Sequence, residues 1–302
     1  MTTDLDRLFD RIDVLKGRPR QVAELTGGLT NKNYRVRTDD GDYVVRVSET
    51  SVGLLAIDRG RERTNTAVAW RAGVGAPVVD ALPESNVLVV GFIEGRTYGP
   101  DDVRDHATIP RIAAALRALH AGDAFEGGFD MRQIRRYYLS VVQERGFRLP
   151  DDYLALAPRI EALEDALAVH DEALVPCNND LLAANFIDDG EKIWIIDYEY
   201  SGMNEASFEL GNAASESGLD DEATAWLVKS YWQRDSVAKL ARARAWSLLA
   251  RYGWTLWASI QDGSSPIDFD FWTWGMAKYD SARGELLGRR YDEILVGLGA
   301  DD

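Results

Sequence analysis

The chain is predicted to be an α+β protein of two lobes, a small antiparallel β-sheet lobe with one helix followed by a larger, mainly helical lobe. Three observations favour this class. The first hundred residues contain short apolar or alternating stretches bounded by turn residues, which is typical of strands. After residue 95 the apolar residues recur at helical spacing. Segment 91–95, with a glycine at each end, separates the two patterns, so we predict lobes at residues 1–95 and 96–302.

Local patterns predict the elements of the first lobe. Apolar residues at helical spacing predict an amphipathic helix over 1–15. The Thr38-Asp39-Asp40-Gly41 segment, flanked by apolar alternation, is typical of a hairpin turn. The further elements, in chain order, are a strand over 21–27, strands over 33–37 and 42–47, a helix over 58–72, and strands over 77–82 and 86–92.

The second lobe is predicted from helical periodicity with one interruption. Residues Ile109, Ile112, Leu116 and Leu119 define a buried helix face, and a similar face covers 160–167. Two short strands, 186–187 and 193–196, flank a tight turn at Asp188-Asp189-Gly190. Helices are then predicted over 222–231, 236–260 and 269–287.

The composition excludes several classes of protein. Cys177 is the one cysteine, so an intrachain disulfide and a cysteine-based metal cage are excluded, and the three histidines lack ligand spacing. The formal charge of −16 argues against a general nucleic-acid binder and favours a cationic ligand. No apolar run approaches the ~18 residues of a membrane span, and residues 1–15 do not resemble a signal peptide. We therefore expect a cytoplasmic protein.

The strongest motif consists of Asp180 and Asn185, which lead into the first short strand, and Asp197, which follows the second. The tight turn between the strands brings all three to one end of a β-hairpin. Phosphoryl transfer needs such a set: one carboxylate orients the attacking hydroxyl and accepts its proton, while an Asn oxygen and a second carboxylate hold Mg²⁺. Taken singly, these residues could equally cap turns or lie on the surface; their order and spacing favour catalysis.

At this point the sequence resembles the choline/ethanolamine kinase family, a branch of the aminoglycoside-phosphotransferase-like group with a protein-kinase-like fold. The resemblance covers nearly the whole chain. The string from Gly27 to Tyr34 matches the loop that covers the nucleotide phosphates in this family. Paired glycines let the backbone approach phosphate, and polar side chains supply donors. The resemblance thus assigns nucleotide binding to Gly28, Thr30, Asn31, Lys32 and Asn33.

The resemblance implies further nucleotide contacts. Arg46, on the third strand, stands where most kinase-like proteins have lysine and would hold the α- and β-phosphates. Glu62 on the following helix is its natural ion-pair partner, although such a pair is also common on solvated surfaces. Phe92 and Ile93 match the hinge whose backbone bonds the adenine edge.

The catalytic string departs from the family pattern at two positions. Asn178 replaces a histidine that braces the loop and the metal-binding acid. Glu209 stands where the family usually has aspartate and is expected to brace the same loop. Asp180, Asn185 and Asp197 match the family pattern, which makes a catalytically inactive relative the minority interpretation.

Seven of the nine tryptophans follow residue 220, which either builds a tryptophan-rich core or supplies a cation site. Trp254 and Trp257 share one helix face, and aromatic faces attract quaternary ammonium. The resemblance places the choline-binding cage at Trp254, Trp257 and Trp274, the last usually a tyrosine. It also assigns substrate contacts to Glu216 and Glu199.

The predicted function is an ATP- and Mg²⁺-dependent kinase that phosphorylates the hydroxyl of choline, or of a close amino alcohol, to give phosphocholine. One alternative is a kinase for another cationic hydroxyl compound, such as ethanolamine, thiamine, an aminoglycoside or an amino sugar. The other is a non-catalytic relative that binds choline or nucleotide, supported by Asn178 alone. The expected partner is a small cationic alcohol and not a nucleic acid; a homodimer is compatible with the sequence.

Overall fold

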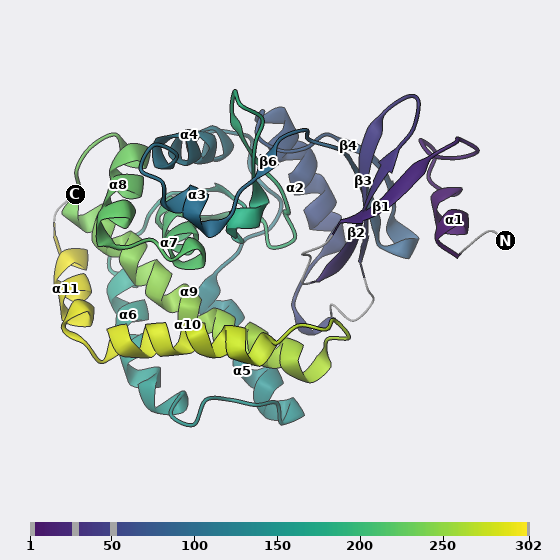
Figure 1. Ribbon diagram of the computed structural model, residues 1–302. Coiled ribbons are helices and arrows are strands. Elements are labelled where there is room, and N and C mark those ends of the chain that lie inside the picture. Colours follow the sequence, from purple (N-terminus) through teal and green to yellow (C-terminus); the bar gives the residue numbers. More distant parts are fainter. Residues whose placement is uncertain (1–3, 26–29, 49–52, 301–302) are drawn as a thin grey trace.

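A computed structural model describes residues 4–25, 30–48 and 53–300. Figure 1 shows the two predicted parts, a twisted sheet near the N-terminus and a larger body of helices that ends at the C-terminus on the opposite side. The α+β class is therefore confirmed. Five antiparallel strands form the sheet in the order β1-β2-β3-β5-β4. Their bounds are Gln21–Leu25, Asn31–Arg37, Asp42–Ser48, Val78–Leu82 for β4 and Val87–Gly91 for β5.

The N-terminal segment differs from its prediction. Helix α1 spans only Asp4–Phe9, and residues 1–3 lie outside the described residues. Beyond Phe9 the chain continues in tight turns, in which Ile12 donates to the Phe9 carbonyl and Leu15 to that of Ile12. These turns still bury Phe9, Ile12 and Leu15 against the sheet. The apolar residues therefore recur at helical spacing although the segment is not one continuous helix.

Helix α2 (Arg59–Arg71) connects the sheet to the helical body. Its N-cap is Asp58, whose carboxylate accepts from the N–H groups of Gly60 and Arg61. Farther along, the Asn65 amide donates to the Ser201 hydroxyl and carbonyl and to the Glu126 carbonyl. A buried amide with several partners fixes the helix relative to both parts of the chain.

Two small sheets surround the segment with the catalytic motif. Strand β6 (Arg96–Thr97) pairs with β8 (Phe186–Asp188), which pairs with β9 (Ile193–Ile195), and all neighbours are antiparallel. Strand β7 (Leu174–Cys177) pairs with β10 (Gly202–Glu205). The β8–β9 pair is the predicted hairpin, which its turn at Asp188-Asp189-Gly190 marks in the sequence. Strands β6, β7 and β10 were not predicted, because no such turn connects these short segments to their partners.

Helix α9 forms the centre of the helical body and packs against α5, α7, α10 and α11 (Figure 1). Most of its residues are buried, and its core includes Trp246, Leu249 and Leu256. The helices are α3 (Pro100–Arg104), α4 (Ile109–His120), α5 (Met131–Arg145), α6 (Ala157–Ala168), α7 (Ala206–Ser217), α8 (Asp221–Trp232), α9 (Val237–Ser264), α10 (Phe271–Leu286) and α11 (Arg289–Leu298). Among the described residues, none of the helices is both long and apolar enough to span a membrane.

Candidate active site

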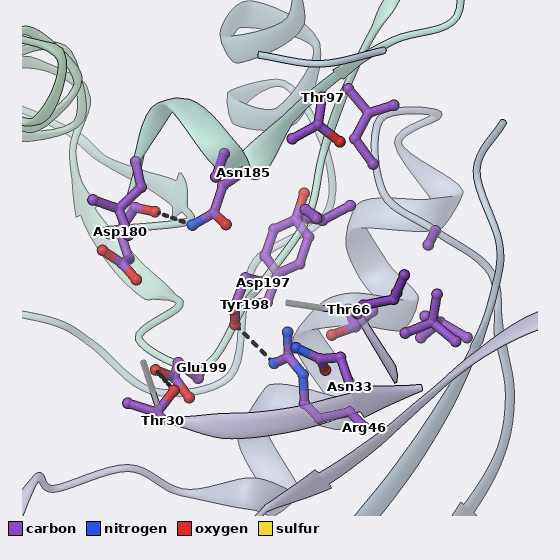
Figure 2. Close-up of a pocket in the computed structure, with 18 of the residues that line it drawn as sticks. Thr30, Asn33, Arg46, Thr66, Thr97, Asp180, Asn185, Asp197, Tyr198 and Glu199 are labelled. Carbon is purple, nitrogen blue, oxygen red and sulfur yellow. Dashed lines mark hydrogen bonds and ion pairs between the residues drawn. The ribbon is translucent and has the colours of Figure 1, made fainter. Parts of the chain in front are cut away.

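A cavity of about 450 Å³ lies where the β-sheet meets the helical body, and Figure 2 shows its polar side. The sheet contributes Thr30, Asn33 and Arg46, and the catalytic motif approaches from the opposite wall. Apolar residues line the part near the 91–95 segment, and aromatic residues of the helical body line another part. The cavity therefore offers one polar centre between two apolar regions.

The three residues of the predicted catalytic motif all line this cavity. Asp180 and Asn185 belong to the loop between β7 and β8, and Asp197 follows β9, so the hairpin brings them together. The amide nitrogen of Asn185 donates to the Asp180 carbonyl at 2.7 Å, and its oxygen lies on the side facing Asp197 (Figure 2). Amide and carboxylate oxygens of this kind are suitable ligands for Mg²⁺.

The electrostatics of the polar centre are dominated by crowded acids. Burial, together with the negative charges of Asp197 and Glu199, raises the pKa of Asp180 well above its ordinary value. Burial and the Asp197 charge also raise the pKa of Glu199 to about 7, although Arg59 and Arg46 oppose this rise. Such a concentration of buried negative charge favours a bound cation.

Asn178 braces the catalytic loop with its side chain. Its amide nitrogen donates to the carbonyls of Ile196 and Asp197 at 3.1 and 2.8 Å, and its oxygen accepts from the Asp180 N–H at 3.0 Å. Asn179 and Asp197 both have positive φ, 67° and 63°, which is unusual for residues other than glycine. These bonds hold a backbone conformation that the loop does not favour by itself.

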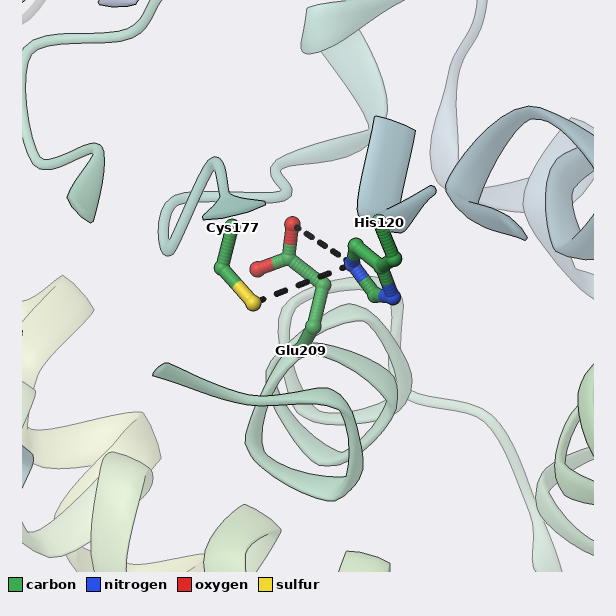
Figure 3. Close-up of side chains that lie close together, drawn as sticks. All are labelled: His120, Cys177 and Glu209. Carbon is green, nitrogen blue, oxygen red and sulfur yellow. Dashed lines mark hydrogen bonds and ion pairs between the residues drawn. The ribbon is translucent and has the colours of Figure 1, made fainter. Parts of the chain in front are cut away.

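Glu209, on α7, binds the backbone of the same loop with its carboxylate. Its two carboxylate oxygens accept from the N–H groups of Asn178 and Asn179 at 2.7 and 2.8 Å. Figure 3 shows Glu209 beside His120 and Cys177, and these three offer ligand atoms within 4.8 Å of one another. Because Glu209 already binds the loop, and burial raises the pKa of the Cys177 thiol well above its usual range, we assign this cluster to bracing the loop and not to a metal.

Arg46 reaches from β3 to the catalytic segment. One of its nitrogens lies 2.5 Å from a Glu62 oxygen and 2.7 Å from Oδ1 of Asp197 (Figure 2). Burial disfavours its charged form, but the charges of Asp197 and Glu62 outweigh burial and raise the pKa of Arg46. The guanidinium is therefore fixed at the cavity wall in its charged form.

The predicted phosphate-covering loop is described only in part. Gly27, Gly28 and Leu29 lie outside the described residues. Thr30 and Asn33 line the cavity, but Asn31 and Lys32 do not, because Asn31 is buried and Lys32 points to the exposed face of β2. Asn31 and Lys32 were predicted to contact a nucleotide, but neither of them lines the cavity.

Glu199 lines the cavity and joins the two parts of the chain. It accepts from the Thr30 hydroxyl at 2.9 Å and the Asn31 amide at 3.0 Å. Arg59 donates to it at 3.1 Å and also pairs with Glu62 at 2.7 Å. These contacts hold β2 against the catalytic segment, and the substrate contact expected from the sequence stays a prediction. Arg59 was missed, because a helix-start arginine carries no distinctive sequence signal.

The predicted hinge lines the apolar end of the cavity. Phe92 and Ile93 both belong to the lining, but the Phe92 N–H already donates to the Asp42 carbonyl at 2.9 Å. The Phe92 N–H is therefore already paired within the protein, and the predicted adenine contact of the hinge stays a prediction. Around the hinge, the wall is formed by Val44, Ala76, Leu88, Val90, Leu182, Ile187 and Ile196.

The aromatic end of the cavity is formed by the three tryptophans predicted as the cage, Trp254, Trp257 and Trp274. The Trp257 and Trp274 ring centroids lie 5.4 Å apart at 61°, and the Trp257 indole nitrogen donates to the Tyr200 hydroxyl at 2.9 Å. Tyr200 also lines the cavity, and sequence reasoning missed it. By contrast, Trp246 packs inside the core and donates to Glu205.

Glu216, predicted as a substrate contact, lines the same cavity as this aromatic group and is paired with a lysine. The ammonium of Lys278 lies 2.8 and 2.7 Å from its two oxygens. Lys278 was missed, although it follows Trp274 by four residues on α10 and so shares its helix face.

The fold and site together define a kinase-like phosphotransferase. The sequence profile of the choline/ethanolamine kinase family matches residues 22–238. The chain belongs to this family and is an ATP-dependent phosphotransferase that acts on an alcohol, as its sequence indicated.

Individual relatives agree with this assignment. Ethanolamine kinase 2 of Rattus norvegicus is 29% identical over 319 residues, which cover 90% of this chain and 81% of that protein. Protein LicA of Haemophilus influenzae is 28% identical over 214 residues, which cover 68% of this chain and 61% of that protein.

Solved structures agree on the fold. A choline/ethanolamine kinase family protein from Mesorhizobium loti superposes with a TM-score of 0.86 at 28% identity, over 99% of each chain. A gentamicin complex of the aminoglycoside phosphotransferase APH(2")-IIa superposes with a TM-score of 0.68 at 15% identity, over 97% of this chain and 98% of that one. The protein-kinase-like fold predicted from the resemblance is thereby confirmed.

Proposed function

We propose that this enzyme transfers the γ-phosphoryl group of ATP to the hydroxyl of choline, giving phosphocholine. The observation that carries the proposal is that Asp180 and three tryptophan side chains line one cavity. A quaternary ammonium in the aromatic end would bring the hydroxyl of a short alcohol toward the polar centre. Stacked aromatic faces stabilise a desolvated cation by about 2 kcal/mol or more.

In this proposal Asp180 orients the alcohol and accepts its proton. Its raised pKa makes it a better proton acceptor than an ordinary aspartate once it is ionised. Arg46 and the residues around Thr30 and Asn33 hold the phosphates, and Glu62 fixes Arg46. Asn178 and Glu209 keep the loop in place, so that the acceptor and donor groups meet in a defined geometry.

The oxygen donors of Asn185 and Asp197 fit Mg²⁺, and we propose that these two residues hold it. A bound Mg²⁺ would offset the negative charge that develops on the phosphates. The Asn185 amide is fixed through its nitrogen, which leaves its oxygen as the ligand atom. Arg46 approaches Oδ1 of Asp197 and restrains that carboxylate from the sheet side.

We also propose that the lobes meet at residue 95. The first sheet ends with β5 at Gly91, whereas β6 begins at Arg96 and pairs with β8 of the helical part. Residues 1–95 would then form the nucleotide-binding lobe, and residues 96–302 the lobe with the catalytic loop and the acceptor site.

Ethanolamine is the second candidate acceptor, because relatives at 29% identity are named ethanolamine kinases. A panel that contains choline, ethanolamine, their methylated intermediates, thiamine and aminoglycosides, each with ATP and Mg²⁺, tests the proposal. We expect the highest kcat/KM with choline. The highest kcat/KM with a compound that lacks a quaternary ammonium group would contradict it.

A further inference from the structure

Glu216 and Lys278 form an ion pair at the aromatic end of the cavity, and of the two only Glu216 lines the cavity. Glu216, near the end of α7, lines the cavity, and its side chain is 3% exposed. Lys278, on α10, lies behind it outside the lining and is 11% exposed. The Lys278 nitrogen contacts both Glu216 oxygens, at 2.8 and 2.7 Å. The negative charge of Glu216 is therefore balanced by a cation that belongs to the protein.

The position of Lys278 is fixed by a second contact. Its ammonium lies 4.2 Å from the centroid of the Trp274 ring, within the range of a cation–π interaction. Trp274 in turn packs against Trp257. The carboxylate and the aromatic ring together restrain the Lys278 ammonium to one position.

This arrangement has different consequences for two kinds of ammonium ion. A quaternary ammonium has no N–H groups, and aromatic faces alone satisfy it. A primary ammonium has three N–H donors, and burying them without acceptors is costly. Because both Glu216 oxygens already accept from Lys278, and the Lys278 charge balances that of the carboxylate, Glu216 offers a primary ammonium fewer acceptor sites and a weaker attraction than an unpaired carboxylate would.

We propose that Lys278 is a specificity-determining residue, which occupies the Glu216 carboxylate and so biases the acceptor site toward quaternary ammonium alcohols and against primary-amine alcohols. The proposal rests on the proposed function, since it concerns the acceptor of the same site. Lys278 does not touch the acceptor; it acts through Glu216 and Trp274.

The first experiment compares kcat/KM for choline and ethanolamine in the wild type and in Lys278→Met. The variant keeps the length of the side chain and releases Glu216. We expect the choline-to-ethanolamine ratio to fall by about tenfold or more, mainly through a lower KM for ethanolamine, because a buried donor gains an acceptor. An unchanged ratio in a folded variant overturns the proposal.

Three further variants separate this role from a structural one. Lys278→Arg retains the cation and should retain the wild-type ratio. The double variant Lys278→Met/Glu216→Gln should recover most of the preference for choline, because no released carboxylate remains. Lys229→Met, which removes an exposed lysine paired with Asp235, should leave the ratio unchanged. If the double variant shows the same low ratio as Lys278→Met, the change is a packing effect and the proposal is wrong.

A binding measurement on the unaltered protein keeps the proposal testable if Lys278→Met does not fold. Tryptophan fluorescence is titrated with tetramethylammonium and with methylammonium, neither of which has a hydroxyl. We expect the tetramethylammonium Kd to be at least about tenfold lower. Equal or reversed affinities overturn the proposal even if choline is phosphorylated. If neither choline nor ethanolamine is phosphorylated, the proposed function fails, and this titration still decides the preference of the cage.

Discussion

The side-chain amide of Asn178 donates to the backbone carbonyl of Asp197 over 2.8 Å, which connects the catalytic loop to the segment after β9. The resemblance to the family leads us to expect histidine at this position, and asparagine here makes three hydrogen bonds with its side chain. The substitution therefore preserves the brace, and the protein retains the geometry of an active enzyme. Both loop residues with positive φ, Asn179 and Asp197, depend on this brace.

Replacing this side chain is expected to slow turnover. Asn178→Ala should lower kcat by about tenfold or more, since about 1 kcal/mol of support is lost for each hydrogen bond that fixes the loop. The KM values should change little, because Asn178 does not line the cavity. Steady-state kinetics check this. A variant that is folded and has the wild-type kcat would contradict the assigned role.

Removing the carboxylate under the loop is expected to reduce both stability and turnover. Glu209→Ala leaves two buried N–H groups without their acceptor, at about 1–3 kcal/mol for each. The melting temperature should fall by several degrees, and kcat should fall with it. Glu293→Gln, which alters an exposed ion pair, serves as the control for thermal unfolding. Equal melting temperatures of Glu209→Ala and Glu293→Gln would contradict this interpretation.

The three tryptophans of the cage are expected to affect the KM for the acceptor and not the KM for ATP. Trp257→Ala should raise the KM for choline by about thirtyfold, the effect of losing about 2 kcal/mol of cation–π stabilisation. The KM for ATP should remain within about twofold, because Trp257 lies at the aromatic end of the cavity. Trp272→Phe is a matched control, since that ring packs on Arg148 away from the cavity lining. Equal effects on both substrates would argue against the cage.

Arg46 is expected to affect the nucleotide. Arg46→Ala removes the cation at the cavity wall and should raise the KM for ATP by about tenfold or more, as expected for a lost charge-assisted contact. Arg46→Lys should be intermediate, because an ammonium cannot reproduce the planar fork. Arg37→Ala, an exposed change on the neighbouring strand, should have no effect. An unchanged KM for ATP in Arg46→Ala would remove this residue from the site.

The hairpin that carries the motif is expected to show an acid-sensitive ion pair. Arg111 on α4 contacts Asp188 at 2.5 and 2.8 Å and holds the pKa of that carboxyl well below its usual range, with further bonds from Gly190 and Tyr98. A depressed pKa stabilises the fold above the unfolded-state value, about 3.9, and this stabilisation is lost as the pH falls.

Thermal unfolding at several pH values tests this pair. Asp188→Asn should lower the melting temperature by about 2–4 °C at pH 7, a small shift because the pair is partly solvated. The difference from the wild type should shrink below about pH 4, where the carboxylate of the unfolded chain begins to protonate while that of the folded protein is still ionised. Asp101→Asn, which removes an exposed carboxylate paired with Arg104, should show neither effect. A difference that persists unchanged at low pH would show that the charge is not responsible.

Sequence reasoning reached the main strands and helices α2, α4, α6, α8, α9 and α10. It missed helices α5 and α11, although each buries one face, and it missed α7, whose buried face includes Ser207, Glu209 and Asn212, which do not look apolar. In the site, Asp180, Asn185 and Asp197 could be grouped because one hairpin connects them. Lys278 and Arg59 were missed, because the site residues that they contact, Glu216 and Glu199, lie far away in the sequence. The position of Glu199 likewise depends on how β2 docks, which no local pattern shows.

The most direct test of the account is to identify the product by ³¹P NMR after incubation with ATP, Mg²⁺ and choline, in the wild type and in Asp180→Asn. We predict that the wild type forms ADP and one new phosphomonoester, phosphocholine, in equal amounts. We also predict that Asp180→Asn, with binding of choline retained, forms it at least about 10²-fold more slowly, the usual size of general-base catalysis. Phosphocholine formation by the variant at the wild-type rate, or ATP hydrolysis with no phosphomonoester, would contradict the account.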